Sequence, residues 1–148
     1  MTDVLKRLDD LLKQGQDYFN QATDANISKK PGPEKWSKKE ILGHLIDSAV
    51  NNLQRFTEIQ FEGKPYKIRK YNQDELVKAN DYQNADIGEI IGFWLAINQR
   101  ISILMKQQTE ETLAFKIEVD KGEIADLRFL MTDYVDHLEH HIKQIKSL

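Results

Sequence analysis

The chain has 148 residues, of which 40% are hydrophobic and 30% charged, and its formal net charge is −3. This length predicts a single domain, residues 1–148, with an ordinary core, and this composition excludes a disordered chain. The near balance of 21 basic and 24 acidic residues argues against a nucleic-acid partner, which usually requires a strongly basic face. Because cysteine is absent, disulfides, thiolate zinc sites and a cysteine nucleophile are excluded.

No export or membrane segment is expected from the pattern of apolar residues. Charged residues interrupt the start of the chain, where a secretion signal needs a continuous apolar stretch. The longest apolar run, Ile90 to Ile97, is broken by Gly92 and is far shorter than the ~20 residues that span a bilayer. We therefore expect a cytoplasmic protein without a membrane partner.

The first half of the chain carries two segments with the apolar spacing of amphipathic helices. The first extends from about residue 2 to 23, and a loop follows from about 24 to 36. The second is predicted to begin at Ser37, because Ser37 and Glu40 have the spacing of a capping box. Trp36 and Ile41 stand where a hydrophobic staple would bring them together. This helix is expected to run to about Glu62, with Gly63 as its C-terminal cap.

The second half predicts a short helix at residues 73–79 and two further long helices. The third long helix is expected from about Asp86 to Gln108, with Phe93 and Trp94 in the core. Residues 112–119 alternate weakly and predict an extended connector. The fourth long helix is expected to begin after Asp120 and to run nearly to the end of the chain, with a heptad stripe on one face.

Four amphipathic helices of this length most economically bury their apolar faces as an all-α four-helix bundle. The connections between them are long, so a simple up-down-up-down order is not required. Such a bundle could also dimerise through an apolar helix face, and we expect a homodimer.

Three of the four histidines of the chain lie within five residues near its end: His137, His140 and His141. His137 and His141 are spaced i, i+4, so both imidazoles project from one side of the helix and could reach one metal ion. His140 is rotated by about 100° from His141 and is expected to face solvent. A pair of this kind also arises without a metal, and the H-E-x-x-H pattern of zinc proteases is absent.

His44 lies early in the second helix, directly after Gly43. Glycine inside a helix costs ~1 kcal/mol relative to alanine, which points to a close approach of a neighbouring segment or a ligand at Gly43. Asp47 lies three residues after His44 on the same face and could orient His44 or act near a metal-bound water. A histidine such as His44, taken alone, is more often a surface residue or a buried, hydrogen-bonded one than a metal ligand.

A small basic cluster, Lys64 to Lys70, carries interleaved tyrosines. It favours a solvated loop, and the alternative is a surface that receives an anionic cosubstrate at the mouth of the bundle.

Two stretches of the sequence resemble the DinB-like superfamily, also called the YfiT/DinB family. The first is W-S-K-K-E-I-L-G-H-L-I-D-S, residues 36–48, and the second is D-Y-V-D-H-L-E-H-H-I-K-Q-I, residues 133–145. They occur in the order found in the family, and the similarity in pattern covers essentially the whole chain.

The resemblance implies a four-helix bundle whose metal ligands are His44, His137 and His141. The position of Asp47 one turn after His44 adds the prediction that Asp47 assists as a catalytic residue. It implies a divalent ion, nickel or zinc, and in some relatives a low-molecular-weight thiol as cosubstrate. The expected function is therefore a metal-dependent hydrolase or thiol S-transferase that acts on a small molecule. The alternative is a non-catalytic metal-binding or dimerising helical module connected with stress.

Overall fold

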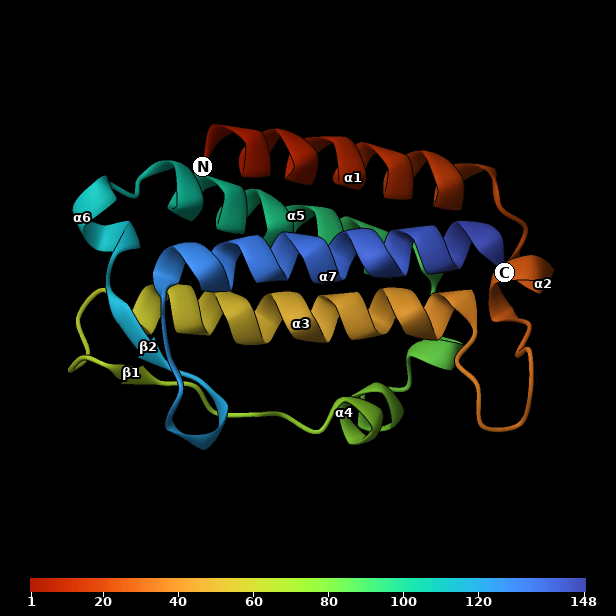
Figure 1. Ribbon diagram of the computed structural model, residues 1–148. Helices are drawn as coiled ribbons and strands as arrows, with labels where there is room; N and C mark the ends of the chain where they lie inside the picture. The colour runs from red at the N-terminus through yellow and green to blue at the C-terminus, as the bar shows by residue number, and fades with distance from the viewer.

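Four long helices make up most of the chain in the computed structural model, which describes residues 1–148 (Figure 1). They are α1 (Thr2–Gln21), α3 (Lys38–Glu58), α5 (Ile87–Lys106) and α7 (Leu127–Ser147). Helices α1 and α3 both pack against α5 and α7. Figure 1 shows that α1 and α7 run in one direction while α3 and α5 run in the other. The predicted four-helix bundle is confirmed, and its helix order is not up-down-up-down.

The core consists of 28 buried hydrophobic residues contributed mainly by the four long helices. Leu8 of α1, Leu45 of α3, Trp94 of α5 and Leu138 of α7 are each at most 1% exposed. Phe93 is 47% exposed, so its predicted place in the core is wrong. It is adjacent to Trp94 on the helix, and a rotation of about 100° per residue turns its side chain away from the core.

Helix α3 begins as predicted, with a complete capping box between Ser37 and Glu40. It ends at Glu58 instead of Glu62, and its C-terminal cap is Ile59 rather than Gly63. The next backbone bonds run from Gln60 to Thr57 and from Phe61 to Glu58. Because these bonds span three residues, the chain leaves the helix through tight turns before it reaches Gly63.

Besides a 3₁₀ turn within the small sheet, four short helical segments lie in the connections. They are α2 (Asp24–Ser28), α4 (Gln73–Ala79), the 3₁₀ turn η1 (Tyr82–Asn84) and α6 (Glu110–Leu113). Helix α4 has the predicted bounds, whereas α2 lies inside the segment predicted as a loop. The side chain of Thr23 accepts a bond from the amide of Asn26 and caps α2. Segments α2, α4 and η1 all pack on α3, which explains why its first half is buried.

A small sheet joins the two long connections at one end of the bundle. Strand β1 (Tyr66–Lys67) pairs in parallel with β2 (Lys116–Glu118), which pairs antiparallel with β3 (Ile124–Asp126). A 3₁₀ turn, η2 (Asp120–Gly122), links β2 to β3. The fourth long helix therefore does not begin directly after Asp120, as predicted, but seven residues after it. It begins at Leu127, where the side chain of Asp126 accepts a bond of 2.8 Å from the amide of Phe129.

Helix α5 is long and apolar enough to cross a bilayer when judged by length and composition alone, with a mean hydropathy of 1.2 over its most apolar stretch. In this structure it packs against α1 and α3, and it places Ile90, Trp94, Ile97 and Ile101 in the core. A helix in the core of a bundle can have the same length and apolar composition, so these two properties alone do not indicate a membrane span.

Candidate metal centre

Helices α3 and α7 bring three imidazoles together. His44 is in the first half of α3, and His137 and His141 lie one turn apart on α7. Their ring centroids are 5.0 Å apart for His44 and His137, 4.8 Å for His44 and His141, and 4.5 Å for His137 and His141. The convergence predicted from two distant stretches of sequence is present.

The spacing of the ring nitrogens fits a single cation. One nitrogen from each histidine lies within 4.8 Å of the other two, and the Nε2 atoms of His44 and His137 are 3.1 Å apart. Zinc–nitrogen bonds of ~2.0–2.1 Å in a tetrahedral site separate two ligand nitrogens by roughly 3.4 Å. Small side-chain movements would therefore place all three nitrogens on one ion.

The surroundings keep these imidazoles neutral. Burial, together with the neighbouring His141 and His137, lowers the pKa of His44 to about 3. Burial, His141 and His140 lower the pKa of His137 to about 4, and burial also lowers the pKa of His141. Neutral imidazoles have free lone pairs, which is the form that binds a metal.

Gln144 contacts the ring of His141 and fixes its orientation. Its Oε1 lies 2.7 Å from Nδ1 of His141, so with the amide oxygen as acceptor the proton is on Nδ1 and the Nε2 lone pair is free. Bonds of this kind fix the orientation of metal-binding histidines. His140 is exposed, as predicted, although its ring lies 5.0 Å from that of His141.

Trp36 covers His44, with their ring centroids 4.9 Å apart. Trp36 and Gln144 also line a cavity of about 520 Å³ between the 31–36 segment, the start of α4 and the end of α7. Two walls of this cavity therefore contact histidines of the cluster. A cavity of this volume suits a small-molecule ligand.

Asp47 is buried on α3 but its hydrogen bonds lead away from the histidines. Its Oδ1 accepts from the hydroxyl of Tyr82 at 2.7 Å and from Nδ2 of Asn80 at 3.0 Å. Its Oδ2 and the Nδ1 of His44 are both buried without a hydrogen-bond partner. Burial raises the pKa of Asp47, while the bonds from Tyr82 and Asn80 act in the opposite direction. The assisting role of Asp47 stays a prediction.

Gly43 provides the close approach that its place in a helix indicated. A Cβ at this position would lie 2.1 Å from Cδ2 of Tyr82, so the tyrosine ring rests directly on the helix backbone. The contact brings Tyr82 to Asp47, and it explains why the glycine precedes His44.

The sequence did not indicate the roles of Trp36, Gln144 and Tyr82 around the histidines. The i, i+3 spacing of His141 and Gln144 could have suggested their contact, since such residues share a helix face. Trp36 is predicted to form a hydrophobic staple and opens the stretch that resembles the family, but neither indicates its contact with His44. Nothing in the spacing of Tyr82 connects it to Asp47.

Solved structures similar to this one share its fold. The YfiT structure from Bacillus subtilis, described as a probable metal-dependent hydrolase with an unusual four-helix-bundle topology, matches with a TM-score of 0.88 at 22% identity and covers 99% of this chain and 83% of that one. A mycothiol-dependent maleylpyruvate isomerase matches with a TM-score of 0.73 at 10% identity, over 96% of this chain and 59% of that one. At these identities the likeness shows the fold alone.

Curated relatives extend over nearly the whole chain. The protein named "Putative metal-dependent hydrolase YfiT" of Bacillus subtilis (strain 168) is 27% identical, over 98% of this chain and 80% of its own length. A Bacillus pumilus (strain SAFR-032) protein of the same hydrolase description is 26% identical, over 97% of this chain and 82% of its own length. Residues 2–145 match the DinB superfamily. The sequence resemblance is thereby confirmed, and the chain belongs to the DinB superfamily.

Proposed function

We propose that this protein is a divalent-metal-dependent enzyme in which His44, His137 and His141 hold the ion. The observation that carries the proposal is the convergence of three neutral imidazoles from two helices within 4.8 Å of one another. The names of the Bacillus relatives, which describe metal-dependent hydrolases, support it.

The ligand set favours a catalytic centre over a closed structural one. Three histidines leave at least one coordination position for water or substrate. Imidazole nitrogen suits zinc and nickel among the divalent ions. A bound ion of this kind would act as a Lewis acid and lower the pKa of a coordinated water or thiol. This chain contributes three things to the metal centre: histidines that are neutral, a bond from His141 to Gln144, and the cover of His44 by Trp36.

Two reaction types follow, and they differ in the nucleophile. Activated water gives a hydrolase, which is the description that the relatives carry. An activated thiol gives an S-transferase, and a structural neighbour is described as mycothiol-dependent. Because this chain has no cysteine, the thiol would have to be a separate small molecule. Metal-loaded protein is assayed on a panel of esters and electrophiles, with and without added small thiols. Turnover without a thiol indicates a hydrolase, and turnover that requires the thiol indicates an S-transferase.

Metal content tests the site directly. After incubation with zinc or nickel and removal of unbound ion, we expect close to one ion per chain in the parent protein. His44→Ala, His137→Ala and His141→Ala should each lose most of the bound metal, because two imidazoles hold a divalent ion far more weakly than three. His140→Ala is the matched control on the same helix and should keep it. Negligible binding by the parent protein would contradict the proposal.

Thermal stability gives a second measurement of the same site. Metal that binds only the folded state should raise the free energy of unfolding by about 2.7 kcal/mol at a hundredfold excess over Kd. The increase should be absent in His44→Ala. Stabilisation without turnover of any substrate would favour the alternative, a non-catalytic metal-binding module.

A further inference from the structure

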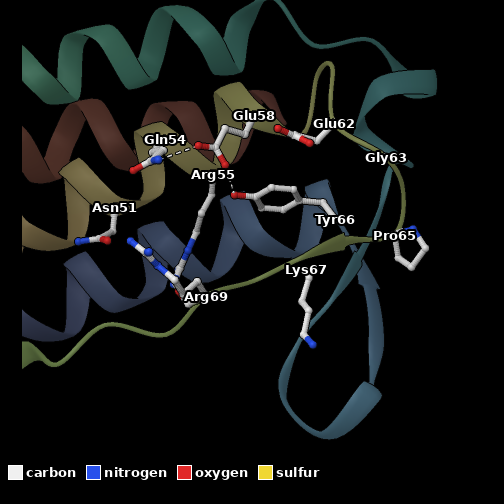
Figure 2. Close-up of a pocket in the computed structure, with 10 residues that line it drawn as sticks. All are labelled: Asn51, Gln54, Arg55, Glu58, Glu62, Gly63, Pro65, Tyr66, Lys67 and Arg69. Atoms are coloured by element: carbon white, nitrogen blue, oxygen red, sulfur yellow. Dashed lines mark hydrogen bonds between the residues drawn. The ribbon is translucent and has the colours of Figure 1, made fainter.

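A second cavity lies away from the histidines, between the second half of α3 and the segment that leads into and out of β1. It has a volume of about 580 Å³, and almost all of the ten residues that line it are polar or charged. Figure 2 shows Asn51, Arg55 and Glu58 on the helix side and Tyr66 and Arg69 on the other side. We call it the arginine pocket, after Arg55 and Arg69.

Arg55 is a half-buried cation without a counter-ion. Its Nη2 donates to the main-chain oxygen of Arg69 at 2.6 Å and its Nη1 to Oδ1 of Asn52 at 3.5 Å, and both acceptors are neutral. Neither Arg55 nor Arg69 forms any of the eight ion pairs of the structure. Burial lowers the pKa of Arg55, which reflects the cost of a desolvated positive charge.

Two carboxylates, Glu58 and Glu62, line the same cavity, and Glu58 is already hydrogen-bonded through both oxygens. Glu58 accepts from Nε2 of Gln54 at 2.6 Å through Oε1 and from the hydroxyl of Tyr66 at 2.8 Å through Oε2 (Figure 2). These two bonds, with a smaller contribution from Arg69, lower the pKa of Glu58. Both of its oxygens accept from neutral donors, and neither Glu58 nor Glu62 forms an ion pair with Arg55.

The lysines of the predicted basic cluster have other partners. Lys67 lies 4.0 Å from Glu118, and Lys70 lies 3.0 Å from Asp120. Lys64 stands over the ring of Phe115, 4.3 Å from its centroid. Of the three cations that line the arginine pocket, Lys67 has an ion pair and Arg55 and Arg69 have none. A planar guanidinium fork binds carboxylate and phosphate groups in a way that lysine cannot.

We propose that the arginine pocket binds a small polar molecule through its carboxylate or phosphate group, with Arg55 and Arg69 as the anion-binding residues. The amides of Asn51 and Gln54 line the same cavity and suit a polar rather than an apolar body. Arg55 follows His44 by eleven residues on α3, about 16 Å along the helix axis. The pocket is therefore separate from the histidine cluster, and the proposal does not depend on a bound metal.

Titration calorimetry on metal-free protein tests the pocket, because anions also bind metal ions directly. Inorganic phosphate and malonate are the probes, at constant ionic strength since free charges are screened by salt. We expect saturable binding of at least one probe at one site per chain, and the better probe identifies the preferred group. Removing one charged donor should weaken binding by about tenfold to a hundredfold.

Arg69→Gln is the decisive variant, because it keeps the main-chain oxygen that Arg55 binds. It should weaken binding, and Arg55→Gln should do the same. Arg100→Gln, an exposed change of equal charge on α5, is the control and should bind like the parent protein. Absence of saturable binding by both probes, or an equal loss in Arg100→Gln and Arg69→Gln, would overturn the proposal. Metal content and turnover are measured separately, so failure here leaves the proposed function untouched.

Discussion

Three side chains around the histidine cluster orient or cover the residues of the site. Gln144 fixes one ring, Trp36 covers another, and Tyr82 holds Asp47 through a bond of 2.7 Å. None of these three residues is itself a candidate ligand. Their effect on the site should therefore be visible in affinity and stability even when all three histidines remain.

Gln144→Ala should weaken metal binding without unfolding the protein. Loss of the bond to Nδ1 lets the His141 ring rotate and removes the acceptor that selects its tautomer, and changes of this kind typically cost roughly 10–100-fold in metal affinity. Competition with a chromogenic chelator measures the affinity. Lys143→Ala, at an exposed neighbouring position, is the control and should match the parent protein. Identical affinities in Gln144→Ala and the parent would show that His141 is oriented by other contacts.

Gly43→Ala should destabilise the protein although alanine favours helices. The added Cβ would overlap the ring of Tyr82, only 2.1 Å away, and overpacking typically costs ~1–3 kcal/mol. Chemical denaturation measures the difference. Gly92→Ala is the matched control, because no atom lies within 4 Å of the place that its methyl group would take on α5, and it should stabilise by up to ~1 kcal/mol. The hypothesis fails if both variants gain stability.

At the scale of elements, side-chain hydrogen bonds cap the first turns of α3, α5 and α7 and mark where these helices begin. The predicted starts of α1, α3, α4 and α5 are correct, and at α3 and α5 Ser37 and Asp86 each accept a bond from the amide three residues on. The start of α7 was predicted several residues too early. Residues 116–118 and 124–126 pair as strands, so the chain between them makes a hairpin turn instead of a first helical turn.

Asp126→Ala should therefore cost stability, whereas Asp120→Ala should not. The carboxylate of Asp126 caps α7, and losing an N-cap of this type costs ~0.5–2 kcal/mol. Asp120 forms an exposed ion pair with Lys70, and such pairs contribute ~0–1 kcal/mol. Urea denaturation of the two variants compares them. A larger loss in Asp120→Ala would mean that the helix begins earlier than the structure shows.

At the scale of the whole molecule, the fold was largely predictable because most of it depends on local periodicity. The apolar spacing in each long helix is visible within a single short stretch of sequence. The sheet was missed, since β1 and β2 have two and three residues and their pairing joins Tyr66 to the distant Ile117. The weak alternation of residues 112–119 predicted an extended segment, and β2 lies inside it. The pairing itself is determined by how the bundle brings the connections together.

The histidine cluster was predictable for a different reason. His137 and His141 share a face by spacing, but only the resemblance to a family connected them to His44. The arginine pocket was indicated only in part, because Arg69 belongs to the basic segment Lys64 to Lys70, for which an anion-binding surface was the alternative, whereas Arg55 lies inside a regular helix. Half-burial and missing counter-ions become visible only once the chain is folded.

Stability of the metal-free protein should fall as the pH is lowered below about 6.5. Unfolded histidines take up protons near this pH, whereas folded His44 and His137 do so only near about 3 and about 4. The unfolded state thus binds more protons between these values, so stability that is present above about pH 6.5 is lost progressively on acidification. Urea midpoints measured from neutral to acidic pH give the slope.

The slope should be shallower in His44→Gln, because the substituted side chain no longer titrates. Parallel curves for the parent and His44→Gln would contradict the assignment of a depressed pKa to His44. Burial raises the pKa values of Asp47 and Asp133, and their effect on the pH dependence of stability is opposite to that of the histidines. Both residues are present in the parent protein and in His44→Gln, so their effect cancels in the comparison.

The contact between Trp36 and His44 has an optical consequence. The chain has only two tryptophans, and Trp94 is fully enclosed in the core. The indole of Trp36 alone lies against the cluster, so its fluorescence should respond when a paramagnetic ion such as nickel enters and quenches it. Loading of the centre could then be followed in real time, without any added dye or label.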